Sequence, residues 1–150
     1  MIIALSIIQI ITLTSLSGNS LSFFNRYPMK KFANQILADS QVEKRIGLYQ
    51  LGNHRARMGV MTGLPSIYLN NPEDLKLFIE TQNNVYIVMR QSDWQSEFRN
   101  LPITITATDT GWGKKSLDKE EIELLLQDGL KPHLQEYSES YVLLKAKGES

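Results

Sequence analysis

Residues Val85–Met89 form an unbroken apolar and aromatic run, V-Y-I-V-M, which limits the folds open to this chain. A strand with one face in water alternates apolar and polar residues, and this run does not alternate. Such a run is typical of a strand that is covered on both faces, as in α/β domains. We therefore predict that Val85–Met89 is the central strand of a sheet.

Short helix and strand patterns alternate along the rest of the chain. The predicted strands are Ile46–Leu51, Ser66–Leu69, Ile103–Ala107 (apolar on one face only) and Tyr141–Ala146, with a turn at Asp109–Gly113. The predicted helices are Pro28–Ser40, a short one within Asn53–Gly63, one capped by Asn71, one capped by Ser92 that carries Trp94 and Phe98, and one that starts with a capping box at Asp118 and Glu121. This alternation predicts an α/β layered domain with a mostly parallel sheet and helices on both faces, although the last two strands could pair antiparallel at one edge.

Composition and motifs restrict the chemistry of the chain. Its 150 residues include 16 Lys+Arg and 16 Asp+Glu, so we expect no nucleic-acid partner, because binding DNA or RNA needs excess positive charge. The chain has no Cys and only two His, which excludes disulfides, thiolate metal sites and a cysteine nucleophile. It also has no Gly-rich phosphate loop and no G-x-S-x-G motif. We therefore predict no metal, no cofactor and no catalytic residue.

Two features are candidates for binding. His54, Arg55 and Arg57 form the densest basic patch, which suits a phosphate or an anionic lipid headgroup. The alternative is a solvated face, as for most charged runs. Trp112 lies in the predicted turn and suits a contact surface, the alternative being that it packs onto the sheet. The predicted binding residues are therefore His54, Arg55, Arg57 and Trp112.

The first 25 residues carry no charge, and Ile2–Leu16 is mostly apolar. This apolar stretch is shorter than the roughly 20 residues that span a bilayer. It can be the end of a transmembrane helix, a signal peptide that lacks its basic start, or a buried element of the fold. We favour the first interpretation and predict a membrane-associated segment and linker at 1–25, followed by a single α/β domain at 26–150.

The order of several short motifs is similar to that of a known family. These motifs are Lys30–Ile36 (K-K-F-A-N-Q-I), a strand with Tyr49, Met61–Pro65 (M-T-G-L-P), Asn71–Leu75 (N-P-E-D-L) and the strand Val85–Met89 with Asp93 soon after. Between about Pro28 and Gln95 the chain resembles the C-terminal soluble domain of polytopic membrane glycosyltransferases of the aminoarabinose-transferase and protein O-mannosyltransferase superfamily. It departs from the family at Val60–Leu64, where many relatives have aromatic-Tyr-x-Gly-Arg.

The resemblance implies an extracytoplasmic accessory domain that follows the last transmembrane helix of an enzyme with a polyprenyl-phosphate sugar donor. The acidic catalytic residues of that superfamily lie in an early loop far upstream, so the resemblance transfers no catalytic residue to this chain. The segment alone is therefore predicted to be inactive. The implied partners are the lipid bilayer, the membrane-embedded catalytic part and a polyprenyl-phosphate or glycolipid headgroup.

Two other functions stay open at the level of sequence. One is a stand-alone, membrane-tethered α/β module that binds a ligand or a protein. The other is a small enzyme that gathers Asp93, Asp109 and His54 in one pocket.

The side of the membrane on which the domain lies is predicted in two conflicting ways. Arg26, Lys30 and Lys31 follow the apolar segment and no basic residue precedes it, so the positive-inside rule places the domain in the cytoplasm. The resemblance implies the periplasmic side. We follow the resemblance, because loops elsewhere in a polytopic protein also set orientation.

Overall fold

The computed structural model describes residues 28–40, 44–82, 84–112, 118–128 and 138–146. Contacts divide these residues into two compact units, of which one holds residues 28–110 and 140–146 and the other holds the described parts of 111–139. The predicted membrane segment, residues 1–25, lies outside the described residues. Within the described ranges, no helix has the length and apolar character needed to cross a bilayer.

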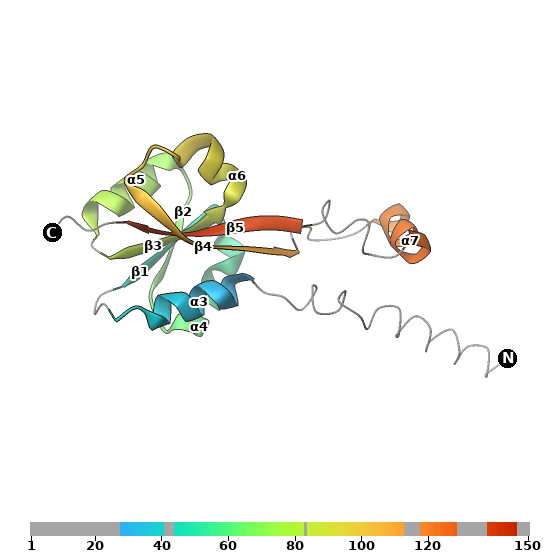
Figure 1. Cartoon of the computed structure of the whole chain (residues 1–150), viewed down its shortest axis with the longest axis horizontal. Coiled ribbons are helices and arrows are strands. Elements are labelled where there is room, and N and C mark those ends of the chain that lie inside the picture. Colours follow the sequence, from blue (N-terminus) through green and yellow to red (C-terminus); the bar gives the residue numbers. More distant parts are fainter. Residues whose placement is uncertain (1–27, 41–43, 83, 113–117, 129–137, 147–150) are drawn as a thin grey trace. The chain divides into compact units, whose positions relative to one another are not determined.

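Five strands form one sheet in the order β2-β1-β3-β5-β4 (Figure 1). The strands are β1 (Arg45–Tyr49), β2 (Ser66–Leu69), β3 (Val85–Arg90), β4 (Ile103–Trp112) and β5 (Ser138–Ala146). β1 pairs in parallel with β2 on one side and with β3 on the other. β3 is the middle strand and its residues Val85–Met89 are all buried, which confirms the predicted central strand.

The sheet is mixed, so the prediction of a mostly parallel sheet is wrong. Tyr86 pairs with Lys145 and Arg90 pairs with Tyr141, which makes β5 antiparallel to β3. The hydroxyl oxygens of Thr110 and Ser140 lie 3.0 Å apart, so the last part of β4 and the first part of β5 meet at the same end of the sheet. This end is also the carboxyl end of β3, since Arg90 pairs with Tyr141 near the start of β5. A strand that enters the sheet there must run opposite to β3.

Helices cover both faces of the sheet (Figure 1), which confirms the predicted α/β class. One face carries α3 (Pro28–Ala38) and α4 (Arg55–Thr62). A 3-10 turn, η1 (Gly52–His54), joins β1 to α4. The other face carries α5 (Pro72–Thr81), the short α6 (Gln91–Asp93) and a π-helical turn, η2 (Trp94–Phe98). The connections β1–α4–β2 and β2–α5–β3 are therefore crossovers on opposite faces.

Each face of the sheet has its own core. The apolar stripe of α3 is buried at Met29, Phe32, Ala33 and Ile36, whereas Leu37 is 50% exposed. On the opposite face, α5 buries Leu75 and Phe78 in a cluster that includes Val85, Ile87 and Met89 of β3. The apolar residues of each helix thus lie on the side that packs against the sheet.

Several local predictions are confirmed at atomic level. Asn71 caps α5, since its side-chain oxygen accepts a hydrogen bond from the backbone N–H of Asp74 at 2.8 Å. Gly63 ends α4 in the left-handed conformation, with φ of 67°. In α7 (Lys119–Asp128), the helix of the second unit, the backbone N–H groups of Asp118 and Glu121 each donate to the other's carboxylate, as in a capping box.

Two local predictions are wrong. Residues 109–112 of the predicted turn belong to β4, because pairing with β5 extends the strand through them. Ser92 does not cap the turn η2 that carries Trp94, since Ser92 lies inside α6 and neither α6 nor η2 has a side-chain cap. The apolar face of β4 is only partly buried, since Ile105 is 42% exposed.

Candidate functional site at the carboxyl edge of β1 and β3

The chain leaves β1 and β3 toward opposite faces of the sheet. β1 continues through η1 into α4 on one face, and β3 continues into α6 and η2 on the other (Figure 1). In open α/β sheets, ligands bind beyond the carboxyl ends of parallel strands where neighbouring connections diverge in this way. The side chains that follow β1 and β3 are therefore the first candidates for a functional site.

Tyr49, the last residue of β1, presents a buried hydroxyl at this edge. Its side chain is 2% exposed, and its ring packs edge-on against Phe98 with the centroids 4.9 Å apart. Burial raises the pKa of Tyr49 above its ordinary value of 10.0, and the nearby carboxylates of Glu97 and Asp93 raise it further. The hydroxyl is therefore protonated at neutral pH and remains a hydrogen-bond donor.

Gln50 follows Tyr49 in an unusual backbone conformation. Its φ is 52°, in the left-handed region that residues other than glycine seldom adopt. This conformation ends β1, and the Gln50 amide Nε2 donates to the Tyr49 hydroxyl at 3.3 Å. Local strain of this kind is retained where the surrounding structure requires it, and it is frequent at functional sites.

Asp93 contributes a carboxylate from the short helix after β3. Its Oδ2 atom is buried and lies 3.8 Å from Nη1 of Arg90, beyond hydrogen-bond distance. Among the described residues no group donates a hydrogen bond to this oxygen. Buried carboxylate oxygens normally accept at least one hydrogen bond, so this atom suits a hydroxyl or ammonium group of a ligand. We call Tyr49, Gln50, Arg90, Asp93 and Glu97 the carboxyl-edge cluster.

The structure brings one of the predicted binding residues to the same edge. His54 ends η1, and its ring meets the ring of Tyr141 in a T-shaped contact with the centroids 6.0 Å apart. Tyr141 is the strand partner of Arg90, which belongs to the carboxyl-edge cluster. His54 therefore lies beside the cluster.

The other predicted residues are not gathered with His54. Arg55 and Arg57 are exposed in the first turn of α4, and Nε of Arg55 donates to the backbone oxygen of Ser66 at 2.9 Å, at the start of β2. Trp112 is the last residue of β4, and its side chain lies outside the described part of the structure. The basic patch predicted from sequence is thus divided between two places.

The arrangement required for a carboxylate enzyme is not found in the described residues. Asp109 is buried within β4, and its Oδ1 accepts a hydrogen bond from the backbone N–H of Thr110. An open groove on this unit is lined by Asp74 but by none of Asp93, Asp109 and His54. Across the described ranges, no group of three or more His, Asp or Glu side chains suits a metal ion.

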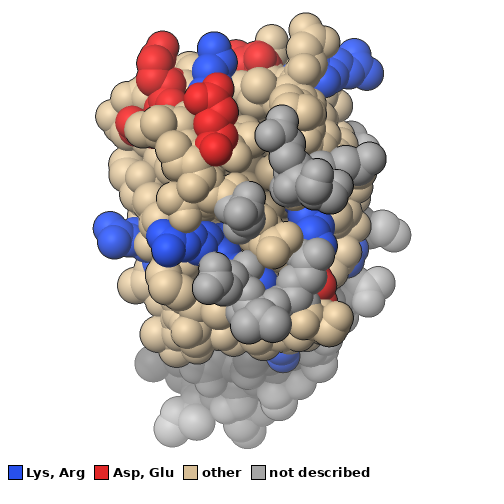
Figure 2. Space-filling model, turned by 90° about the vertical axis from the view of Figure 1, so that its left-hand side faces the viewer, with Lys and Arg blue, Asp and Glu red and all other residues tan. Residues whose placement is uncertain are grey.

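A second polar cluster lies at the opposite end of the parallel strands. Oδ2 of Asp39 accepts hydrogen bonds from the Tyr86 hydroxyl and, at 2.7 Å, from Nζ of Lys145. Nζ of Lys44 donates to the backbone oxygen of Asp39 and, at 2.9 Å, to that of Ile36. These bonds tie the end of α3 to β3 and β5. Figure 2 shows this end of the molecule, where Lys and Arg side chains form a band across the surface and Asp and Glu gather above it.

Most of the carboxyl-edge cluster was missed by the search for motifs. Tyr49 and Gln50 lie near the end of the predicted strand Ile46–Leu51, and Arg90 and Asp93 follow the predicted strand Val85–Met89. Polar residues directly after two parallel strands are the available signal, because parallel strands place their carboxyl ends at one edge. Using that signal requires knowing that the two strands are neighbours, which the sheet order establishes.

Comparison with known proteins finds no matching family model, no similar curated protein and no similar solved structure.

Proposed function

We propose that this chain is a non-catalytic accessory domain of a membrane glycosyltransferase that uses a polyprenyl-phosphate sugar donor, and that it lies on the periplasmic side. The observation that carries the proposal is where the resembling motifs fall in the fold. They form the start of α3, the end of β1, the turn from α4 into β2, the cap of α5 and the central strand β3. All of them belong to one compact unit, as expected for a domain inherited as a whole.

The carboxyl-edge cluster supports a role in holding the sugar part of a donor or an acceptor. A tyrosine hydroxyl, an amide, a guanidinium group and carboxylates are the groups that hydrogen-bond sugar hydroxyls in proteins. The Asp93 oxygen that accepts no hydrogen bond from the described residues is the acceptor that a sugar hydroxyl would meet. Beside the cluster, His54 suits the phosphate or headgroup that accompanies such a sugar.

Protease access in intact spheroplasts tests the location of the domain. In cells that make the full-length natural protein, we expect an external protease to digest the domain before the membrane is permeabilised. Protection until permeabilisation would mean a cytoplasmic domain, and the glycosyltransferase assignment would then be wrong.

A transfer assay tests the absence of catalysis. The purified 150-residue chain in detergent, supplied with a radiolabelled polyprenyl-phosphate sugar, should release no labelled product. Turnover that is lost in Asp93→Asn but retained in the neighbouring Ser92→Ala would make the chain an enzyme and overturn the accessory role.

The second candidate is a stand-alone, membrane-tethered module that binds a hydroxylated or cationic ligand. The Asp93 oxygen supports this candidate as well, because it can accept a hydrogen bond from a ligand that has no connection with a glycosyltransferase. An antibody against the chain distinguishes the two on a blot of native membranes. A product much larger than 17.1 kDa supports the polytopic enzyme, whereas a product near that mass supports the module.

A further inference from the structure

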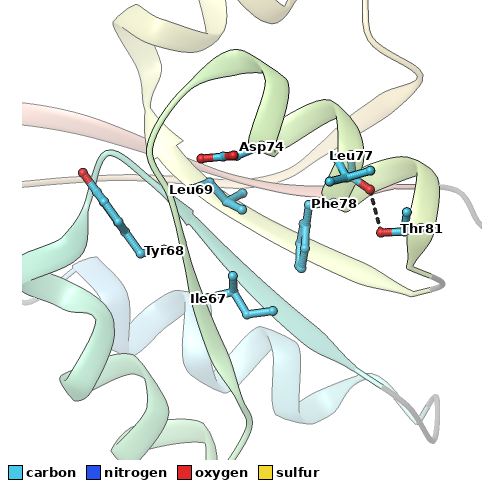
Figure 3. A pocket seen from close by; sticks show the side chains of 7 residues that line it. All are labelled: Ile67, Tyr68, Leu69, Asp74, Leu77, Phe78 and Thr81. Atoms are coloured by element: carbon cyan, nitrogen blue, oxygen red, sulfur yellow. Dashed lines mark hydrogen bonds between the residues drawn. The ribbon is translucent and has the colours of Figure 1, made fainter.

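Strand β2 forms one outer edge of the sheet, and an open groove of about 300 Å³ lies between it and α5 (Figure 3). Apolar side chains of both elements are open to solvent there, since Tyr68 is 40% exposed and Leu77 is 60% exposed. An outer strand with accessible backbone groups is a template for another strand.

The register between β1 and β2 shows which backbone groups of β2 point outward. The N–H of Ile46 donates to the backbone oxygen of Pro65 at 3.3 Å, and the N–H of Gln50 donates to that of Leu69 at 2.9 Å. Successive residues of a strand direct their backbone groups to opposite sides. The backbone groups of Ser66, Tyr68 and Asn70 therefore face away from β1.

Charged side chains occupy the two ends of this outer edge. Nε of Arg55 donates to the oxygen of Ser66 at 2.9 Å, and Oδ2 of Asp74 accepts from the N–H of Asn70 at 3.1 Å. The N–H and C=O of Tyr68 lie between these two contacts. The edge thus has a positive group at its start, a negative group at its end and one outward-facing backbone pair in the middle.

The opposite edge of the sheet is covered differently. On β4, Lys31 Nζ donates to the oxygen of Thr108 at 2.7 Å, and Gln35 Nε2 donates to the oxygen of Thr106 at 3.0 Å. Both side chains come from α3 and occupy carbonyls of two alternate residues on this edge strand, and covering an edge in this way blocks it against pairing. At β2, no residue in the described ranges bonds the outward N–H and C=O of Tyr68, so this is the edge able to accept a strand.

We propose that β2 pairs antiparallel with β2 of a second copy of this chain, about a two-fold axis that passes beside Tyr68. In this register Tyr68 lies opposite Tyr68 of the partner subunit, and their open N–H and C=O groups exchange two hydrogen bonds. Ser66 then lies opposite Asn70 of the partner subunit. The Ser66 oxygen that Arg55 binds in one copy then accepts from the N–H of Asn70 of the partner subunit, which Asp74 bound before pairing.

The charges at the ends of the edge match this arrangement. When the ladder forms, Arg55 and Asp74 are released from Ser66 and Asn70, and each Arg55 faces Asp74 of the partner subunit. The two-fold axis creates this contact twice, so a single copy carries both halves of a self-complementary surface. The inference rests on the edge of the sheet alone and does not depend on the proposed function.

A single introduced cysteine tests the axis directly, because the chain has no Cys of its own. Directly opposite residues in a hydrogen-bonded antiparallel pair have Cα atoms about 5.5 Å apart, within the range of a disulfide. Mild oxidation of Tyr68→Cys in the full chain, in detergent, should therefore produce a covalent dimer. Ile105→Cys on β4, a residue of similar exposure, should stay monomeric. Equal cross-linking of both variants, or none at position 68, would overturn the proposal.

Charge reversal tests the contact between Arg55 and Asp74. In sedimentation velocity of the full chain, Arg55→Asp and Asp74→Arg should each weaken the dimer several-fold, because two attractive contacts become repulsive. A mixture of the two variants should form a heterodimer, since the carboxylate introduced at position 55 of one copy then meets the guanidinium introduced at position 74 of the other. Arg57→Asp and Glu73→Arg, which change the same helix turns outside the edge, should leave the dimer intact.

Circular dichroism establishes that each variant is folded before the dimers are compared. A heterodimer that forms where both homodimers fail supports the two-fold pair. A chain that is monomeric up to millimolar concentration, or a dimer that the control variants weaken equally, contradicts it. If Asp74→Arg is unfolded, Tyr68→Pro replaces it, because proline removes the outward N–H on an edge strand that tolerates it, and this variant should be a folded monomer.

Discussion

Gly47 in β1 is required by the packing of α5 against the sheet. A Cβ atom at this position would lie 2.7 Å from Cδ1 of Leu69 and 2.8 Å from Cε1 of Phe78, both closer than real contacts allow. Gly47→Ala should therefore lower the free energy of unfolding by about 1–3 kcal/mol, the usual cost of overfilling a core. Urea denaturation of the full chain measures this loss.

Gly59 provides the matched control for that substitution. It lies within α4, and the nearest atoms to an added Cβ are 3.7 Å away. Gly59→Ala should therefore raise the free energy of unfolding by about 0.5–1 kcal/mol, because alanine restricts the unfolded chain and favours the helix. Losses of equal size in both variants would show that Gly47 has no special packing role.

Val88 tests the central position of β3 through a buried charge. Its side chain is fully buried, so Val88→Asp would bury a carboxylate without a partner, at a cost of several kcal/mol. The control is Thr104→Asp on the exposed part of β4, where the cost should be below about 1 kcal/mol. Thr106 is a poorer control, since its hydroxyl donates to the oxygen of Leu143 at 3.1 Å. Similar shifts in denaturant midpoint for Val88→Asp and Thr104→Asp would contradict the burial of Val88.

At the scale of elements, the N-cap of α5 is a local contribution to stability. The Asn71 side chain accepts from the Asp74 N–H at 2.8 Å, and Pro72 occupies the first turn. Asn71→Ala should lower the free energy of unfolding by about 1 kcal/mol, whereas Asn71→Asp should retain most of it, because both side chains accept this bond. A thermal melt that does not distinguish the two variants would show that the cap contributes nothing.

Elements with strong local signals were predictable from the sequence. Asn71 and Pro72 mark the start of α5, Gly63 marks the end of α4, and β2 has the predicted bounds Ser66–Leu69. β4 was predicted too short because Asp109–Gly113 contains the residues that favour turns. Pairing with β5 overrides that local preference, and no local pattern reports the pairing.

At the scale of the whole molecule, the direction of β5 could not be predicted from its own residues. Tyr141–Leu144 is buried on both faces because β5 lies between β3 and β4, so it has the same unbroken apolar pattern as a parallel central strand. The residues of the candidate site were likewise hard to predict from the sequence alone. His54 stands out as one of two histidines, whereas Tyr49 and Asp93 gain meaning only once β1 and β3 are known to be neighbours.

Stability of the whole molecule at alkaline pH should depend on protons that the folded chain holds more tightly than the unfolded chain. Burial and the hydrogen bond to Asp39 raise the pKa of Tyr86 above 10.0, and the hydrogen bond to Asp39 raises the pKa of Lys145 above 10.5. Burial raises the pKa of Tyr49 in the same direction. As pH rises past the ordinary values, the unfolded chain releases these protons first, so the free energy of unfolding falls.

The urea midpoint of the full chain should therefore be steady near neutral pH and decline from about pH 10 upward. Tyr86→Phe removes one of the titrating groups at the Asp39 cluster, so its decline should be shallower than that of the natural chain. If Tyr86→Phe and the natural chain lose stability with the same slope, the hydroxyl of Tyr86 is not held by Asp39 in the folded protein. A stability that rises through this range would reverse the sign and contradict the raised pKa of both Tyr86 and Lys145.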